Sequence, residues 1–136
     1  MNHLQGLSAL VLGLGDSGLA MARWCARCGA SVRVWDSRAV PPNAAALAAQ
    51  VPQATLLVGE LTEAALAEVR LVLKSPGLAP HDPRIAPLLA AARARGIAVQ
   101  GELDLFVEAL AALRADRGYA PRLLAITGTN GKTTTC

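Results

Sequence analysis

Residues 8–22 read Ser-Ala-Leu-Val-Leu-Gly-Leu-Gly-Asp-Ser-Gly-Leu-Ala-Met-Ala, and this stretch decides the expected fold. An apolar run ends at a group of glycines and continues as good helix formers, which predicts a strand, a tight turn and a helix. Gly13, Gly15 and Gly18 have the GxGxxG spacing, which permits a sharp turn, close approach of bare backbone to a diphosphate, and tight helix–strand packing. The first N–H groups of the helix would face that anion. A purely structural strand–helix turn is the alternative interpretation.

The composition describes an aliphatic chain that is long enough for one domain with a core. Of the 136 residues, 53% are hydrophobic and only 3% are aromatic, so we expect a core of Ala, Leu, Val and Ile. No apolar stretch approaches the ~18 residues that cross a bilayer, and the N-terminus lacks the basic and apolar regions of a secretory signal. We therefore expect a cytoplasmic protein without a membrane partner.

The charged and metal-binding residue types exclude several classes of function. The net charge of +3 comes from scattered arginines, which indicates a solvated surface and no nucleic acid partner. Three cysteines are an odd number, which argues against a disulfide framework. Cys25 and Cys28 form a CxxC late in the expected first helix, away from the N-terminus that would stabilise a thiolate, so we interpret them as packing residues. His3, His81 and Cys136 show no zinc-site spacing.

The segment after the first helix predicts a second strand that ends at an acidic residue. Residues 31–35 alternate as Ser-Val-Arg-Val-Trp, and Asp36 follows them. Asp36 lies eighteen residues after Gly18, where dinucleotide-binding domains place an acid that binds the ribose hydroxyls. The alternative is that Asp36 simply starts a turn, because Pro41 and Pro42 indicate a loop.

Further strands and helices alternate along the rest of the chain. The sequence pattern predicts strands over 54–58, 69–73 and 97–100 and helices over 42–50, 61–68, 83–95 and 103–115. Asp82 and Pro83 have the pattern of an N-cap and a first helical residue. The last helix is amphipathic, and we expect Phe106 to lie in the core and not to contact a ligand; the apolar residues at helical spacing are Leu103, Phe106, Val107, Leu110 and Leu113. This alternation predicts an α/β fold, a Rossmann-like parallel sheet with helices on both faces.

Three loops that each follow an expected strand carry residues suited to ligand binding, over 13–18, 36–38 and 75–77. In the third loop, Pro76 keeps Ser75 out of helical geometry, and Gly77 permits a close backbone turn. Ligands of parallel sheets bind beyond the carboxyl ends of the strands, so we expect these loops to converge. The sequence thus predicts a nucleotide-type site at one edge of the sheet.

A second phosphate loop follows another expected strand near the end of the sequence. Residues 122–127 lead into Gly128-Thr-Asn-Gly-Lys-Thr133. Backbone N–H groups would cradle phosphates there, Lys132 would neutralise them, and the hydroxyl of Thr133 would ligate Mg²⁺. Ile126 occupies the position of the usual first glycine, so this loop is a variant of the common pattern.

With two phosphate loops in series, the chain resembles the Mur ligases of peptidoglycan synthesis, and among them the branch that adds D-glutamate. The residues that carry the resemblance are Gly13-Leu-Gly-Asp-Ser-Gly18, Asp36-Ser-Arg38, Ser75-Pro-Gly77, Gly101-Glu-Leu-Asp-Leu-Phe106 and Thr127-Gly-Thr-Asn-Gly-Lys-Thr-Thr134. Folylpolyglutamate synthetases share the phosphate loop, so specificity within the group rests on the Ser-Pro-Gly and Gly-Glu-Leu-Asp-Leu-Phe segments. The resemblance covers essentially the whole chain.

This resemblance implies a ligase that depends on ATP and Mg²⁺. Its substrates would be UDP-N-acetylmuramoyl-L-alanine, D-glutamate and ATP. The γ-phosphoryl group would pass to the L-alanine carboxylate, and the D-glutamate amine would attack the resulting acyl phosphate. Enzymes of the family are several times longer, so the resemblance also implies a fragment that binds the UDP moiety, is inactive alone and is monomeric.

The resemblance also assigns residues and domains. The UDP-substrate contacts would be Gly15, Asp16, Ser17, Gly18, Asp36, Ser37, Arg38, Ser75, Pro76 and Gly77. The ATP contacts would be Gly128, Thr129, Asn130, Gly131, Lys132, Thr133 and Thr134, with Thr133 as the metal ligand and no catalytic residue in this chain. Residues 1–102 would hold the UDP substrate, 103–121 would form a helix and linker, and 122–136 would begin the ATP-binding domain. Asp16 departs from the expected pattern because its carboxylate would lie beside a diphosphate.

Two other functions remain open from the sequence. An NAD(P)-binding domain of an oxidoreductase would explain the glycine turn and Asp36, but it leaves residues 128–134 without a role. A non-catalytic regulatory module that senses a nucleotide is compatible with the second phosphate loop, which the sequence gives without its helix.

Overall fold

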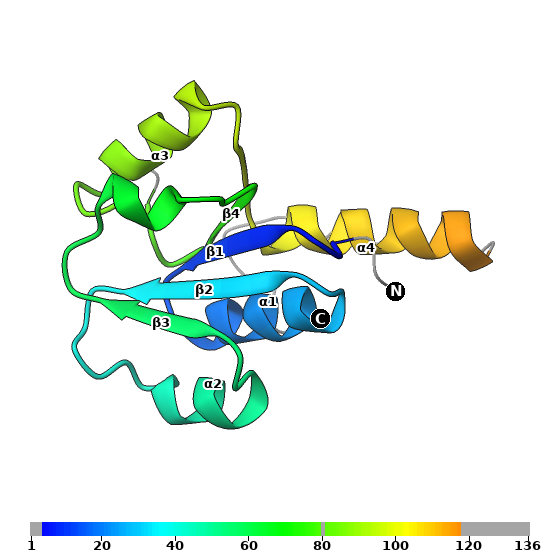
Figure 1. Ribbon diagram of the computed structural model, residues 1–136, viewed down its shortest axis with the longest axis horizontal. Helices are drawn as coiled ribbons and strands as arrows, with labels where there is room; N and C mark the ends of the chain where they lie inside the picture. The colour runs from blue at the N-terminus through cyan, green and yellow to red at the C-terminus, as the bar shows by residue number, and fades with distance from the viewer. Residues whose placement is uncertain (1–3, 80, 118–136) are drawn as a thin grey trace, which may run out of the picture.

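The computed structural model describes residues 4–79 and 81–117, and its centre is a parallel sheet. The sheet of this described part has five strands in the order β3-β2-β1-β4-β5, and every neighbouring pair is parallel (Figure 1). The strands are β1 (Ser8–Leu12), β2 (Ser31–Asp36), β3 (Thr55–Val58), β4 (Leu71–Lys74) and β5 (Ala98–Gln100). The predicted Rossmann-like α/β sheet is therefore confirmed.

Helices cover both faces of this sheet, as the alternation of elements predicts. They are α1 (Asp16–Arg27), α2 (Ala44–Gln50), the short 3₁₀ helix η1 (Glu63–Leu66), α3 (Ala86–Ala94) and α4 (Glu102–Arg117). Ala9 and Val11 of β1 belong to the core under α1 and α2, whereas Leu10 and Leu12 belong to the core under η1 and α3. In the view of Figure 1, α1 overlaps β2 and β3, α2 lies below β3, and α3 lies above β4. Because β1 is buried on both faces, its sequence is a continuous apolar run.

The strand register brings three loops to the same level of the sheet. Leu12 of β1 pairs with Trp35 of β2 on one side and with Lys74 of β4 on the other. The residues that follow these positions therefore leave the sheet side by side at its carboxyl edge. This register is the structural reason why loops that are distant in sequence can form one site.

The two CxxC thiols are packing residues, as predicted. Cys25 and Cys28 are both buried in the core under α1. Burial, with a smaller contribution from neighbouring Cys28, raises the pKa of the Cys25 thiol to about 12. Within the described ranges, no three His, Cys, Asp or Glu side chains gather as a metal site would require. Across the same residues, no helix combines the length and apolar character of a membrane span.

Two expected helices differ in extent from those of the structure. The helix predicted over 61–68 is wrong in length, because only η1 forms there and Glu68 takes a left-handed conformation with φ of 63°. The next helix begins at Ala86, later than the predicted 83. Asp82 accepts the backbone N–H of Arg84 at 2.9 Å, so it caps a turn that precedes the helix.

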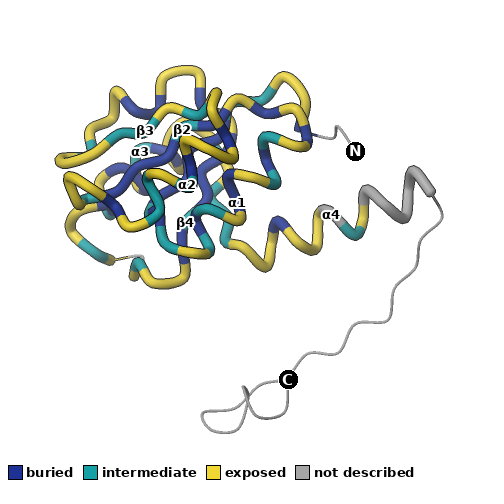
Figure 2. Tube along the Cα trace, turned by 90° about the horizontal axis from the view of Figure 1, so that it is seen from below, coloured by how far each residue is buried: buried dark blue, intermediate teal, exposed yellow. Residues whose placement is uncertain are grey.

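The expectation that Phe106 lies in the core is wrong. Leu103, Phe106 and Val107 are 72%, 51% and 50% exposed, whereas Leu105 is buried in the core under α1. Figure 2 shows that α4 leaves the body of the sheet. Helical spacing identifies residues that share a face, but it does not identify the face that meets a neighbour.

Candidate nucleotide site at the carboxyl edge of the sheet

The three loops converge on one cavity of about 500 Å³ at the carboxyl ends of β1, β2 and β4. Its lining residues are Gly13, Gly15, Asp16, Ser17, Trp35, Asp36, Ser37, Arg38, Ser75, Pro76, Gly77, Leu78 and Arg84. Every residue expected to contact the UDP substrate lines this cavity except Gly18. The cavity is open to solvent, and its lining combines glycine backbone and the apolar side chains of Trp35 and Leu78 with a few charged and hydroxyl groups, as small-molecule sites commonly do.

The three glycines of the first turn have different structural roles. Gly13 has φ of +92°, and its N–H donates to the carbonyl oxygen of Trp35 at 2.6 Å. A Cβ on Gly18 would overlap the carbonyl oxygen of Gly13, so this position requires glycine. A Cβ on Gly15 would meet no atom within 4 Å. The fold therefore needs Gly13 and Gly18, whereas Gly15 leaves open space at the cavity.

The N-terminus of α1 presents backbone donors beside this open space. Gly15 is the N-cap residue, and no side chain caps the helix. The N–H of Leu19 donates to the carbonyl oxygen of Gly15 at 2.9 Å, as the hydrogen bond of the first helical turn. The N–H groups of Asp16, Ser17 and Gly18 precede that turn and have no intrahelical acceptor. Together with the helix dipole, they form a site suited to an anion.

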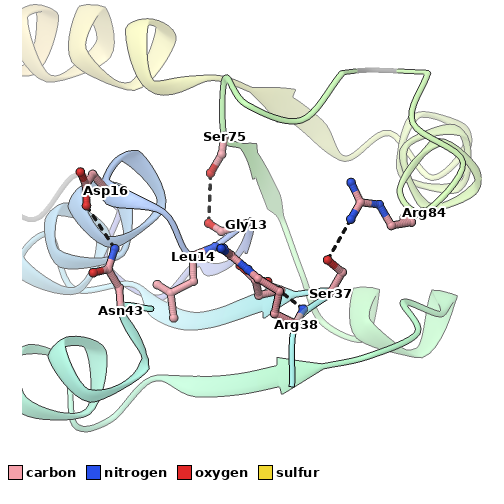
Figure 3. A network of polar contacts seen from close by, with 9 residues as sticks. Gly13, Leu14, Asp16, Ser37, Arg38, Asn43, Ser75 and Arg84 are labelled. Carbon is pink, nitrogen blue, oxygen red and sulfur yellow. Dashed lines mark hydrogen bonds and ion pairs between the residues drawn. The ribbon is translucent and has the colours of Figure 1, made fainter. Parts of the chain in front are cut away.

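The Asp16 carboxylate lies to one side of this helix end. It is exposed and accepts a hydrogen bond from Nδ2 of Asn43 at 3.3 Å. Figure 3 shows the two side chains pointing toward each other, with Asn43 just before α2. Asp16 therefore binds the neighbouring loop and does not cap its own helix.

Asp36 is saturated by hydrogen bonds from its own protein. Its Oδ2 accepts the backbone N–H of Leu14 at 2.9 Å and Nη2 of Arg38 at 2.8 Å. Its Oδ1 accepts the backbone N–H and Nε of Arg38, both at 2.9 Å. These bonds, chiefly the side-chain bonds from Arg38, hold the pKa of the buried Asp36 carboxyl well below its ordinary range. A carboxylate has about four acceptor positions, so this one has none left for a ribose hydroxyl.

The loop after β4 is fixed against the glycine turn. The hydroxyl of Ser75 is largely buried and donates to the carbonyl oxygen of Gly13 at 3.0 Å. Nζ of Lys74 donates to the carbonyl oxygens of Leu78 at 2.6 Å and Ser75 at 3.3 Å. This loop therefore keeps a defined shape, and Gly77 within it has open space at its Cα.

Arg84 is a charged residue of the cavity that the expected binding loops do not include. Its Nη1 donates to the hydroxyl of Ser37, which also lines the cavity, at 2.9 Å (Figure 3). The pattern Asp-x-Arg occurs at 82–84 as it does at 36–38, and this repeat is the signal that could have found it.

The second predicted site lies outside the described residues. It comprises the expected ATP contacts Gly128, Thr129, Asn130, Gly131, Lys132, Thr133 and Thr134, with Thr133 as the expected metal ligand. These assignments stay predictions from the sequence.

Comparison with known proteins identifies the family. A family model described as the N-terminal domain of MurD-like Mur ligases matches residues 7–101. The chain belongs to this family. It is 59% identical over 126 residues to UDP-N-acetylmuramoylalanine–D-glutamate ligase of Ralstonia nicotianae, covering 93% of this chain and 25% of that protein. The ligase of the same name from Albidiferax ferrireducens is 54% identical, over 98% of this chain and 26% of that protein.

These matches confirm the predicted resemblance to Mur ligases, and the MurD-like chain spans about a quarter of the length of these relatives. Among solved structures, shikimate dehydrogenase from Aquifex aeolicus is similar, with a TM-score of 0.53 and 20% identity. That match covers 87% of this chain and 51% of the dehydrogenase. At this identity the likeness concerns the fold alone.

Proposed function

We propose that this chain is the UDP-substrate domain of a ligase that adds D-glutamate to UDP-N-acetylmuramoyl-L-alanine. The observation that carries the proposal is the single cavity that unites the N-terminus of α1, Arg38 and the loop of residues 75–77. A uridine diphosphate needs anion contacts at one end and polar contacts for its nucleoside at the other. The high identity to ligases of this name supports the same substrate here.

In this proposal, the diphosphate lies at the open space beside Gly15 and accepts hydrogen bonds from the first N–H groups of α1. Ser37 and Arg38 face the nucleoside from the end of β2. The role of Asp36 is to position Arg38 and the glycine turn, because its acceptor positions are filled within the protein.

The whole protein would then carry out ATP-dependent amide formation. The γ-phosphoryl group of ATP would pass to the L-alanine carboxylate, and the amine of D-glutamate would displace phosphate from the acyl phosphate. Lys132 would neutralise the phosphates of ATP, and Thr133 would ligate Mg²⁺. Both residues would belong to a domain that begins near residue 122, after a helix and linker over 103–121. Residues 1–102 would bind the UDP substrate, in the cytoplasm and as a monomer.

The state of Asp36 also bears on the oxidoreductase alternative. NAD-binding domains use the acid at the end of the second strand to accept the ribose hydroxyls. Here that acid has no acceptor position left while Arg38 remains bound to it. The arrangement therefore removes the support that Asp36 gives to the oxidoreductase alternative, and the identity to ligases carries the choice of a uridine diphosphate.

A domain exchange tests the proposal. The matching N-terminal quarter of the Ralstonia nicotianae ligase would be replaced by this chain, and ATP-dependent ligation of D-glutamate to UDP-N-acetylmuramoyl-L-alanine would be measured. We expect an active chimera, and we expect Lys132→Ala in the chimera to abolish ligation without changing affinity for UDP. A folded chimera that binds ATP but not the UDP substrate would contradict the proposal.

A further inference from the structure

The cavity contains two arginines that are held by the same local hydrogen-bond pattern. Arg84 donates its backbone N–H and Nε to Oδ1 of Asp82 at 2.9 and 3.0 Å, and its Nη2 to Oδ2 at 2.7 Å. Arg38 makes the corresponding three bonds to Asp36 at 2.9, 2.9 and 2.8 Å. Each Asp carboxylate thus binds one edge of a planar guanidinium through Nε and Nη2. The other edge, with Nη1, points away from that carboxylate.

These two turns approach the cavity from different parts of the sheet. Asp36 ends β2, whereas Asp82 and Arg84 belong to the connection between β4 and α3, and β1 lies between these strands. The bond from Arg84 to Ser37 therefore joins two loops across the cavity (Figure 3). The Arg84 side chain is 53% exposed, so the contact is accessible to a ligand and is not part of the core.

The Asp82–Arg84 pair stays charged at neutral pH. Hydrogen bonds from the Arg84 side chain, followed by its backbone N–H, lower the pKa of the Asp82 carboxyl to about 2. An ion pair at an exposed position contributes little to stability on average. The consequence of this pair is instead that the guanidinium has a fixed orientation at the cavity.

The position of Arg84 indicates which part of the ligand it meets. A diphosphate at the N-terminus of α1 places the ribose near the end of β2, so the base continues toward Ser37 and beyond it. Figure 3 shows Asp16 and Gly13 on one side of the site and Arg84 on the other, past Ser37. A uracil base offers carbonyl oxygens and a flat face. A guanidinium only donates hydrogen bonds, and it stacks on flat rings.

We propose that Arg84, oriented by Asp82, is a base-binding residue of this site and closes the cavity over the uracil of a uridine diphosphate. The inference rests on the proposed function, because that function supplies the uridine ligand. It adds a residue from the β4–α3 connection to a site that the sequence assigns to three other loops. Ser37 is the partner of Arg84 before the ligand enters and lies next to the base afterwards.

Calorimetric titration of the full 136-residue chain tests this inference, with UDP and inorganic pyrophosphate as probes. Pyrophosphate is measured by displacement of UDP. We expect Arg84→Met to weaken UDP binding by about tenfold to a hundredfold, as for the loss of a hydrogen bond from a charged group. We expect pyrophosphate binding to change less than about twofold, because the diphosphate subsite lies at α1. Arg93→Met removes an equal charge from an exposed position on α3 outside the cavity, and it should leave both affinities unchanged.

Arg84→Lys separates a base contact from a general effect of charge, and thermal melting checks that each variant folds. We expect the lysine variant to lose most of the UDP affinity, because an ammonium has no planar fork. Wild-type affinity for UDP in either Arg84 variant would overturn the inference, as would an equal loss of UDP and pyrophosphate binding. Failure of the wild-type chain to bind UDP would instead overturn the proposed function on which it rests.

Discussion

The backbone N–H of Leu14 donates to Oδ2 of Asp36 at 2.9 Å, and this bond joins the glycine turn after β1 to the end of β2. The same carboxylate orients Arg38 through three further hydrogen bonds. Asp36 therefore holds two parts of the site in place: the glycine turn that we expect to meet the diphosphate, and the guanidinium of Arg38. Under the proposed function its part is positioning, and it would act on the ligand through these neighbours.

Replacing Asp36 with Asn should destabilise the domain. An amide nitrogen at one carboxylate position would face donors from Leu14 or Arg38, and charge-assisted hydrogen bonds would be lost. We expect the free energy of unfolding, measured with urea, to fall by about 2 kcal/mol or more. Asp16→Asn is the matched control, because that exposed residue makes one long hydrogen bond and should change stability by less than about 0.5 kcal/mol. Equal, small effects of both changes would contradict this account of Asp36.

Stability should also depend on pH through Asp36. The folded carboxyl has a pKa below its ordinary value of 3.8, so the unfolded chain binds more protons in the acid range. The stabilisation is therefore present above about pH 4 and is lost as the pH falls through the folded pKa. The free energy of unfolding, measured with urea at pH 7, 4 and 3, should fall more steeply with decreasing pH for the wild type than for Asp36→Asn. If the unfolding free energies of the two proteins changed with pH in parallel, Asp36 would not be the group that causes the pH dependence.

The glycines at 15 and 18 should respond in opposite ways to substitution by alanine. Gly18→Ala should destabilise the fold by about 3 kcal/mol or more, because its Cβ overlaps the Gly13 carbonyl oxygen. Gly15 has φ of −85°, which alanine adopts, and its Cβ has open space, so Gly15→Ala should fold normally. We expect it to lose UDP affinity in titrations, because the methyl group occupies the space beside the α1 N–H groups. Full UDP binding by Gly15→Ala would place the diphosphate elsewhere.

The thiols of α1 should be unreactive in the folded chain. Burial raises the pKa of Cys25 to about 12, and burial also raises that of Cys28. In a Cys136→Ser background, a thiol reagent at pH 8 should modify them only as fast as the protein unfolds. Stability should fall as the pH rises above the ordinary thiol value of 9.0, because the unfolded chain then releases a proton that folded Cys25 keeps. Rapid modification with unchanged circular dichroism would contradict this assignment.

The sequence predicts those parts of the site that local patterns specify. The spacing of Gly13, Gly15 and Gly18 predicts the first turn, and the apolar strands predict that the loops at 36–38 and 75–77 share one edge. A local pattern does not predict that all acceptor positions of Asp36 are filled. The hydrogen bond from Leu14 depends on the β1–β2 register, which pairs Leu12 with Trp35.

Arg84 and Phe106 could not be placed from the sequence for a similar reason. The contact of Arg84 with Ser37 joins the connection between β4 and α3 to the loop after β2, and it therefore depends on how distant elements are arranged. Phe106 lies at helical spacing with other apolar residues, but α4 turns Leu105 toward α1 and leaves Phe106 exposed. Patterns within one element do not specify its orientation against another.

Under the proposed function, the cavity at the carboxyl edge binds a uridine diphosphate. Titration of this chain with UDP-N-acetylmuramoyl-L-alanine, with NADH as the comparison ligand, tests it most directly. We predict that the UDP compound binds saturably, that UDP displaces it, and that NADH does not bind. The Lys132→Ala change should leave the affinity for the UDP compound unchanged, whereas Arg38→Met should weaken it. Saturable NADH binding that UDP cannot displace would contradict the claim and favour an oxidoreductase domain.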